Sequence, residues 1–331
     1  MSKGVNKNIN IKFFYIFTLS YLIHYNIHIM IDDYVNKLIE NLPDDTRNFQ
    51  KIDLVLDGGV FNGSYLVGAL YFLKEMERKK YIEIERISGC SVGSIVAFLY
   101  YIDALDLMPK LYEQVNVEFK KNFTLNAIKN LKQYLIKRIP DNICSKVNNK
   151  LFICYNDIKN NKKIVKSSYK NIDDIIDTII KSCYIPLLID NNILYKKKYI
   201  DGITAYIFKS EPHKKILHME LLSYDKIFNS INIKNEKTNF HRILSGLLDI
   251  HSFFIKKSNT SMCSYVNDWG LINKCHYNCK LFIEKIIIII IYFTNNLKKY
   301  ISKDVKENLL FKISSKITFD IFSTILENYC L

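Results

Sequence analysis

The sequence predicts an α/β fold in which a mostly parallel sheet is covered by helices on both faces. Two observations lead to this prediction. Short apolar runs alternate along the chain with longer segments whose apolar residues recur at helical spacing. Glycine-containing turns directly follow the first two of these runs. Strands that alternate with helices in this way are typical of a parallel sheet that is buried on both sides.

The elements can be assigned in chain order up to about residue 225. Residues 107–148 carry apolar residues at helical spacing and are expected to be helical. The pair Asn160-Asn161 separates two strand-like runs and predicts a hairpin turn. The expected strands are Ile52–Asp57, Glu83–Ser88, Leu151–Asp157, Lys162–Lys166, Lys198–Asp201 and Lys215–Tyr224, and the other expected helices are Ser64–Lys80, Val92–Leu105 and Asp173–Cys183.

Beyond residue 225 the pattern favours a C-terminal helical extension. Phe240–Lys257 and residues 303–331 show helical periodicity. Between them, Leu281–Phe293 contains six consecutive isoleucines, Ile286–Ile291. This run is short for a membrane span, and its β-branched residues predict a buried strand or a buried helix. A membrane-embedded segment is the alternative.

Residues 1–31 form a hydrophobic N-terminal segment of nearly membrane length. Phe13–Ile31 contains no Lys, Arg, Asp or Glu, and a spanning helix needs roughly twenty apolar residues. Three lysines precede the run, which favours a cytoplasmic N-terminus if the segment is an anchor. The alternative is an upstream extension before a true start at Met30. A cleaved signal peptide is disfavoured because no small-residue cleavage site follows.

The composition gives a formal net charge of +14. A basic surface can attract anionic lipid headgroups, although abundant Ile, Lys, Asn and Tyr are also typical of an AT-rich genome. No basic and aromatic motif of a nucleic-acid reader is present, so no nucleic-acid partner is expected. The eight cysteines are scattered and show neither zinc-site spacing nor a disulfide framework. No metal is therefore expected. No organic cofactor is expected either.

Two glycine motifs follow the first two expected strands. The second, Gly89-Cys90-Ser91-Val92-Gly93, is a G-x-S-x-G nucleophile elbow. Its glycines allow a strand to turn sharply into a helix, which exposes the Ser91 hydroxyl to a base and a substrate. The first motif is Asp57-Gly58-Gly59-Val60-Phe61-Asn62-Gly63. Its backbone N–H groups can approach a substrate closely because the glycines have no side chains.

Four segments, in this order, resemble the patatin-like phospholipase family. They are the glycine loop at 57–63, the elbow at 89–93, Ser182-Cys183-Tyr184-Ile185-Pro186 and Asp201-Gly202. The resemblance covers roughly residues 50 to 225. It implies a three-layer α/β/α patatin-like fold with the catalytic domain at 45–225. The hydrophobic segment at 1–31 would precede this domain, and a mostly helical extension at 226–331 would follow it.

The resemblance also implies a lipid acyl hydrolase of the phospholipase A or lipase type that uses a Ser-Asp dyad. Ser91 would be the nucleophile and Asp201 the base. The glycine loop would bind the oxyanion through Gly58, Gly59, Val60 and Gly63, and Gly89 and Gly93 would shape the elbow. The substrate would be a glycerolipid or a phospholipid at a membrane surface. The protein would be membrane-associated on the cytoplasmic side, or anchored through residues 13–31.

The glycine loop departs from the family pattern Gly-Gly-Gly-x-Arg/Lys-Gly at two positions. Val60 replaces the third glycine, and a valine at positive φ is strained. Asn62 replaces the basic residue, which removes one stabiliser of the oxyanion region.

Two alternative functions stay open. One is a catalytically weak or inactive lipid-binding protein. The other is a conventional α/β-hydrolase esterase with a Ser-Asp-His triad, whose base would be one of His213, His218, His241 and His251.

Overall fold

The structure is a computed structural model, and it describes most of the chain between residues 31 and 300. Within this range it leaves out residues 224, 225, 228, 229, 231, 235 and 237 and the side chains of 297–300, and beyond it residues 316 and 324 are described. The hydrophobic run before Ile31 lies outside the described residues. So does the helix expected at 303–331, apart from residues 316 and 324.

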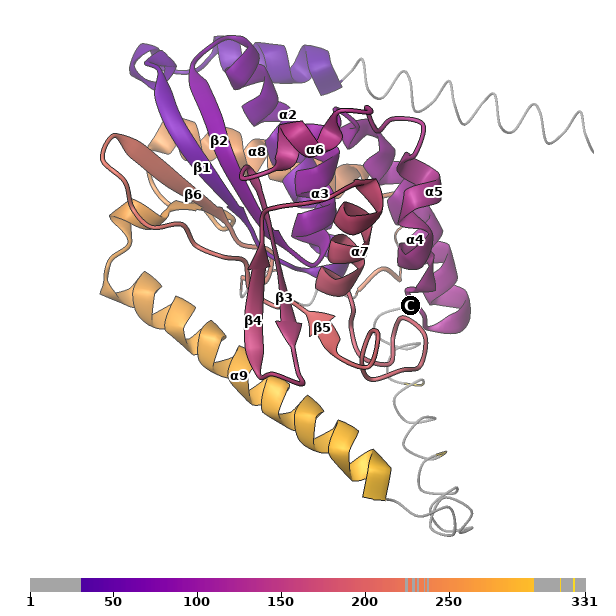
Figure 1. The fold of residues 1–331 in the computed structure, drawn as a ribbon. Helices are drawn as coiled ribbons and strands as arrows, with labels where there is room; N and C mark the ends of the chain where they lie inside the picture. Colours follow the sequence, from indigo (N-terminus) through magenta and orange to yellow (C-terminus); the bar gives the residue numbers. More distant parts are fainter. Residues whose placement is uncertain are drawn as a thin grey trace, which may run out of the picture.

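A seven-stranded sheet forms the centre of the described part (Figure 1). Its order is β4-β3-β2-β1-β6-β7, and β5 also pairs with β3. The β6–β1, β1–β2 and β2–β3 pairs are parallel, whereas β4, β5 and β7 join antiparallel. The mostly parallel sheet is therefore confirmed. The strands are β1 Gln50–Leu56, β2 Ile82–Cys90, β3 Leu151–Asp157, β4 Lys162–Lys166, β5 Tyr199–Asp201, β6 Lys214–Met219 and β7 Cys263–Tyr265.

Helices follow most of the strands, as the alternation predicts, and α8 packs directly on α2. The two helices approach so closely that a Cβ at Gly68 would lie 1.9 Å from the Ile243 carbonyl oxygen. The helices are α2 Gly63–Arg78, α3 Val92–Tyr101, α4 Met108–Asn122, α5 Leu131–Leu135, α6 Ile143–Val147, α7 Ile172–Ser182, α8 Phe240–Lys256 and α9 Leu271–Tyr300. Residues 31–40 are also helical, and the 3-10 turns are η1 Asp44–Arg47, η2 Val60–Asn62, η3 Leu105–Leu107, η4 Asn126–Asn130 and η6 Val266–Asp268.

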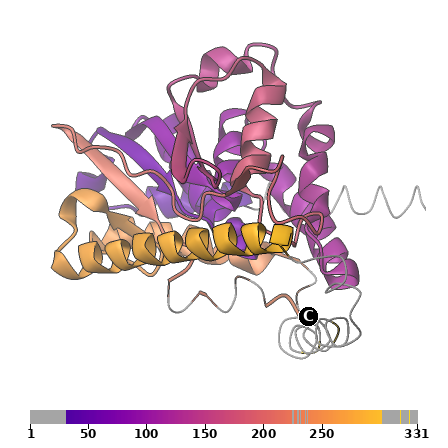
Figure 2. The same cartoon turned by 60° about the horizontal axis from the view of Figure 1, so that its bottom comes forward.

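The two faces of the sheet have separate cores because successive side chains of a strand point to opposite faces. In β1, Leu54 and Leu56 belong to the large core that the helices cover. Val55 points the other way, into a smaller core with Ala205 and Phe208. The segment that follows β5 covers this second face. Helix α9 runs across the edge of the sheet at which the parallel strands have their carboxyl ends (Figure 1, Figure 2).

The expected helical region 107–148 is helical, but in short pieces. Phe123 adopts a left-handed conformation, with φ 53°, and it ends α4. Pro140 precedes α6, and the residue before a proline is disfavoured in the helical conformation. Apolar periodicity alone did not reveal these interruptions.

The prediction that Leu281–Phe293 is buried is wrong. The segment lies in α9, and Ile286, Ile289 and Ile290 are 41%, 50% and 58% exposed. Six consecutive residues of a helix point to all sides, because a turn takes 3.6 residues. Only part of the run therefore reaches the protein: Ile288 and Ile291 pack against a small buried cluster. Among the helices of the described residues, none is both long and apolar enough to cross a membrane.

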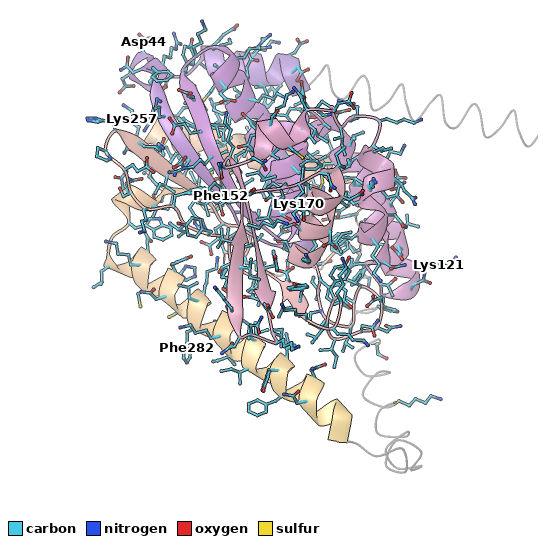
Figure 3. All side chains as sticks on the ribbon, viewed as in Figure 1. Asp44, Lys121, Phe152, Lys170, Lys257 and Phe282 are labelled. Carbon is cyan, nitrogen blue, oxygen red and sulfur yellow. The ribbon has the colours of Figure 1, made fainter. Side chains whose placement is uncertain are left out.

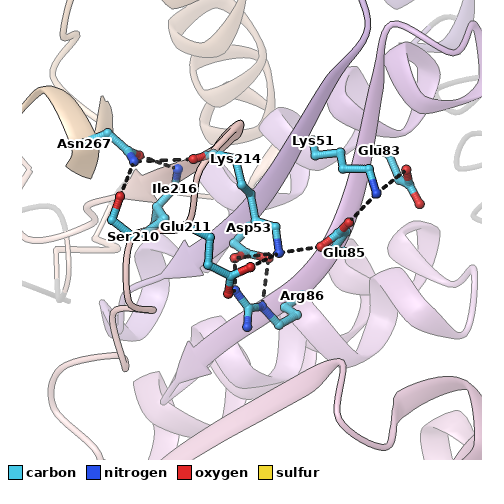
Figure 4. Close-up of polar contacts among 10 residues, drawn as sticks. All are labelled: Lys51, Asp53, Glu83, Glu85, Arg86, Ser210, Glu211, Lys214, Ile216 and Asn267. Atoms are coloured by element: carbon cyan, nitrogen blue, oxygen red, sulfur yellow. Dashed lines mark hydrogen bonds and ion pairs between the residues drawn. The ribbon is translucent and has the colours of Figure 1, made fainter.

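An ionic cluster joins β1, β2 and β6 upstream of their carboxyl ends (Figure 4). The Arg86 guanidinium donates to both carboxylate oxygens of the fully buried Asp53, at 3.0 and 2.5 Å, and to Glu211 at 2.7 Å. Lys214 forms ion pairs with Glu85 and, at 2.9 Å, with Glu211. The charges are thus paired with each other. We assign this cluster a structural role in holding the central strands together.

Candidate active site

Ser91 lies where β2 turns into α3, in the strained backbone conformation of a nucleophile elbow. Its φ is 50° and its ψ is −132°. Both flanking glycines are required by close backbone contacts. A Cβ at Gly93 would lie 2.4 Å from the Leu56 carbonyl oxygen, and one at Gly89 would lie 2.7 Å from the Gly93 carbonyl oxygen. The predicted local geometry of the elbow is therefore present.

Ser182, at the end of α7, holds the elbow in place. Its Oγ accepts a hydrogen bond from the Ser91 N–H at 2.9 Å and donates one to the Cys154 carbonyl oxygen at 2.6 Å. The elbow is thereby linked to both α7 and β3. This contact explains why a serine stands in the Ser-Cys-x-x-Pro segment, a role that the sequence alone did not indicate.

Asp201, the last residue of β5, lies beside Ser91. Its Oδ1 accepts the Ile203 N–H at 2.7 Å. Burial raises the pKa of Asp201 to about 6, and the nearby Glu284 adds to the effect, while the neighbouring Ser91 side chain and the Ile203 N–H oppose it. A carboxylate with this pKa is a stronger base than an exposed aspartate and is still ionised at neutral pH.

The glycine loop lies directly against Ser91. A Cβ at Gly58 would lie 2.9 Å from Ser91 Cβ, and one at Gly63 would lie 2.2 Å from Val92 Cγ2. The N-termini of α2 and α3 therefore stand next to each other, with their N–H groups and positive dipole ends near Ser91. Val60 keeps a left-handed conformation, with φ 47°. Such a conformation costs a β-branched residue roughly 1–3 kcal/mol.

Asn62, which replaces the family's basic residue, is fully buried and makes contacts with three segments. Its Nδ2 donates to the carbonyl oxygens of Leu221 and Lys226, at 2.8 and 3.0 Å. Its Oδ1 accepts a hydrogen bond from Arg242 Nη1 at 2.5 Å. The loop thus has a cation behind it, but the cation comes from α8. That cation, 180 positions away in the sequence, contacts the loop through the Asn62 side chain.

The guanidinium of Arg242 has its own carboxylate partner. Arg242 is completely buried, and its Nη2 and Nε donate to Glu236 Oε1 at 2.6 and 3.0 Å. The Tyr112 hydroxyl donates to the same carboxylate. A continuous polar chain therefore connects α8 to the glycine loop on one side and to α4 on the other.

An apolar cavity opens beside Ser91, between the glycine loop and helices α3, α4 and α5. Of its lining side chains, Ser91, Tyr112, Gln114 and Tyr134 carry polar groups, and the others are mostly aliphatic. The aliphatic lining includes Val60, Ile95, Leu111, Val115, Ile128 and Leu131. Ser91 thus stands at the wall of a pocket whose apolar lining suits a hydrocarbon chain.

A second polar cluster joins the end of β1 to α9. Asp57 Oδ2 pairs with Lys280 Nζ at 3.0 Å and with His218 Nε2 at 3.2 Å. Although burial alone would raise the pKa of Asp57, these two partners hold it well below its usual range. Lys280 also pairs with Glu220 at 2.8 Å. No local sequence pattern indicates this cluster, because Lys280 stands more than 220 residues from Asp57.

Three of the four histidines of the triad alternative have described side-chain contacts with residues other than Ser91. His218 pairs with Asp57, and His241 lies 3.2 Å from Glu236. His251 packs on the Phe72 ring in the layer of α8. His213 stands in the loop before β6, with φ 61°. The titratable side chain whose pKa Ser91 influences is that of Asp201.

Residues 54–206 of the chain match the model of the patatin-like phospholipase family. The chain is 27% identical over 152 residues to the 1-acylglycerol-3-phosphate O-acyltransferase Pnpla3 of Mus musculus, which covers 43% of this chain and 37% of that protein. It is 26% identical over 133 residues to the Homo sapiens protein of that name, which covers 38% of this chain and 28% of that protein. The chain thus matches well under half the length of these relatives.

The matched region contains the glycine loop, the elbow and Asp201. It runs from the end of β1 through β5, and the parallel strand β6 lies beyond it. With this match, residues 54–206 are identified as a patatin-like phospholipase domain.

Proposed function

We propose that the protein is a serine ester hydrolase that cleaves acyl esters of glycerolipids or phospholipids with Ser91 and Asp201. The observation that carries this proposal is the position of Ser91 beside the buried carboxyl group of Asp201 and at the wall of an apolar cavity. A nucleophile and a base in direct contact form the minimal unit of covalent ester hydrolysis. The apolar lining supports an acyl chain as the group that enters.

In the first step the Ser91 Oγ attacks the ester carbonyl carbon while Asp201 takes the hydroxyl proton. The negative charge that forms on the carbonyl oxygen is stabilised by N–H groups of the glycine loop and by the N-termini of α2 and α3. The carbon–oxygen bond to the leaving alcohol then breaks, and Asp201 returns the proton to that alcohol. The product of this step is an acyl ester of Ser91.

In the second step an acceptor attacks the acyl ester, again with Asp201 as the base. With water as the acceptor the products are a free fatty acid and Ser91. With a lipid hydroxyl group as the acceptor the same intermediate would complete an acyl transfer. The names of the two curated relatives make this transfer the second candidate function.

The proposal requires contact with a lipid phase, so we infer a membrane surface as a partner and expect no nucleic-acid partner. A single-pass anchor at residues 13–31 stays a prediction, because the run before Ile31 lies outside the described residues. A position on the cytoplasmic side of a membrane stays a prediction in the same way.

A fluorophosphonate probe is expected to label the purified protein at Ser91. The Ser91→Ala variant should lose both labelling and fatty-acid release, while the control Ser145→Ala, at an exposed serine of α6, should keep both. Product analysis with a radiolabelled phospholipid, with and without a monoacyl acceptor, separates hydrolysis from transfer. A Ser91→Ala protein with full activity would exclude Ser91 as the nucleophile.

The rate is expected to depend on pH through Asp201. The base must be ionised, and the pKa of Asp201 is raised to about 6. The value of kcat/KM should therefore rise about tenfold per pH unit at acidic pH and level off above pH 6. The assay uses a soluble short-chain ester, so that lipid packing does not vary with pH. If the acidic side of the kcat/KM profile had its midpoint near pH 4, the base would be an ordinary exposed carboxylate.

A further inference from the structure

Helix α9 has buried charged residues as well as apolar ones on its inner face, and its outer face is apolar, unlike that of an ordinary surface helix. It is 30 residues long, or about 45 Å at 1.5 Å per residue. It crosses the edge of the sheet at which Asp57 and Asp201 stand (Figure 1, Figure 2).

The inner face is held by buried charges. Lys280 pairs with Asp57 and Glu220, at 3.0 and 2.8 Å. One turn later Glu284, only 3% exposed, pairs with Lys163 at 3.0 Å. Glu284 also accepts a hydrogen bond from the Asn156 amide at 3.1 Å. Since breaking a buried ion pair is costly, these contacts hold α9 in one orientation.

The outer face consists of large apolar side chains that recur every three or four residues. Phe282 is 64% exposed and Phe293 is 59% exposed, and Figure 3 shows Phe282 pointing away from the body of the protein. We call this set the outer stripe. Its exposed members are Ile272, Cys275, Cys279, Phe282, Ile283, Ile286, Ile289, Ile290 and Phe293.

The stripe is continuous on one side of the helix. At 100° per residue its members fall within an arc of about 120°, opposite Lys280 and Glu284. From Phe282 to Phe293 it extends about 17 Å. Contiguous exposed apolar patches of this kind mark interaction sites, because single proteins in water rarely present them.

We propose that the outer stripe lies in the interface of a membrane, parallel to its surface. Exposed Lys274 and Lys285 stand on the same side of α9, next to the stripe, where they can contact anionic headgroups. The formal net charge of +14 adds long-range attraction to the same surface. Apolar residues with aromatic rings on one face and lysines at the border are typical of interfacial helices.

The orientation has a consequence for catalysis, which rests on the proposed function. Asn156, which contacts Glu284, also donates to the Asp201 carbonyl oxygen at 2.9 Å. Glu284 itself raises the pKa of Asp201. A membrane on the outer stripe would therefore place lipid beside the edge of the sheet that carries Ser91 and Asp201. The substrate would reach the site from the bilayer surface.

The test places a reporter on the stripe. An environment-sensitive fluorophore is attached to Cys279 of the full chain, with Cys144, Cys275 and Cys330 changed to serine. The vesicles contain ether-linked phosphatidylcholine and phosphatidylglycerol, which an ester hydrolase cannot cleave. Part of the lipid carries a doxyl quencher. A second sample carries the fluorophore at Leu248→Cys, on the outer side of α8, as the matched control.

We expect the Cys279 fluorophore to shift to the blue and to be quenched, and the Leu248→Cys fluorophore to remain unquenched. Ile286→Asp should raise the lipid concentration needed for half-maximal quenching at Cys279 by about tenfold or more. The substitution removes one apolar side chain from the membrane interface and inserts a charge there. Leu248→Asp, at a residue of similar exposure, should not change it.

Three results would overturn the proposal. The first is an unquenched Cys279 fluorophore in protein that floats with the vesicles. The second is a full chain that does not float at all. The third is a dimer in the absence of lipid that Ile286→Asp converts to a monomer, because a second copy would then cover the stripe. None of these readouts uses ester hydrolysis, so the proposed function could stand if this inference failed.

Discussion

Asp201→Asn is expected to lower the rate of ester hydrolysis by about 10⁴-fold or more. The amide has nearly the shape of the carboxylate, but it cannot accept the proton of the Ser91 hydroxyl. The Ile203 N–H, which donates to Asp201 Oδ1 at 2.7 Å, can still find an oxygen acceptor. The fold should therefore persist, and kcat should fall far more than KM changes. Burst and steady-state kinetics with a chromogenic ester measure both values.

Two controls separate this effect from a general loss of a buried charge. Asp157→Asn removes another buried carboxylate of the same sheet, one that is ion-paired with Lys198, and it should keep most of the activity. Single replacements of the four histidines by glutamine should do the same. The dyad would be refuted by one histidine variant as inactive as Ser91→Ala combined with a mildly impaired Asp201→Asn.

Arg242→Met should lower the free energy of unfolding by about 3–5 kcal/mol, the usual effect of removing one partner of a buried ion pair. The methionine fills much of the volume but leaves Glu236 without its guanidinium and Asn62 Oδ1 without its donor. Because Asn62 belongs to the glycine loop, kcat should fall as well. Urea unfolding followed by circular dichroism measures the stability.

The matched control is Arg78→Met, at the end of α2. Arg78 pairs with Glu75 in the same helix and is largely exposed, so this variant should unfold almost as the unmodified protein does. An Arg242→Met protein within about 1 kcal/mol of the unmodified one would mean that Glu236 finds another partner or is neutral in the fold.

Local patterns were sufficient for most of the fold. The hairpin of β3 and β4 has the predicted bounds, because an Asn-Asn turn between two alternating runs specifies both strands. The elbow was predictable for a similar reason. Gly89 is required by the Gly93 backbone within the same strand-turn-helix unit, and the G-x-S-x-G spacing is typical of that turn. Gly93 is also required by the Leu56 carbonyl oxygen of the neighbouring strand β1.

The C-terminal region shows where local patterns fail. The isoleucines of α9 predict burial when they are considered alone, yet Ile286, Ile289 and Ile290 are exposed. Their exposure follows from Lys280 and Glu284, whose partners Asp57 and Lys163 lie in distant strands. No pattern within the helix indicates that its charged residues point inward.

Local patterns predicted most of the strands and helices up to residue 225 and the elbow around Ser91, since each depends on residues that are close in the chain. The surroundings of these elements became visible in the folded chain. There Asp201 lies near Ser91, Arg242 contacts Asn62, and α9 pairs with the end of β1. Ion pairs and burial depend on distance in space. Partners more than a hundred residues apart leave no mark in the spacing of either segment.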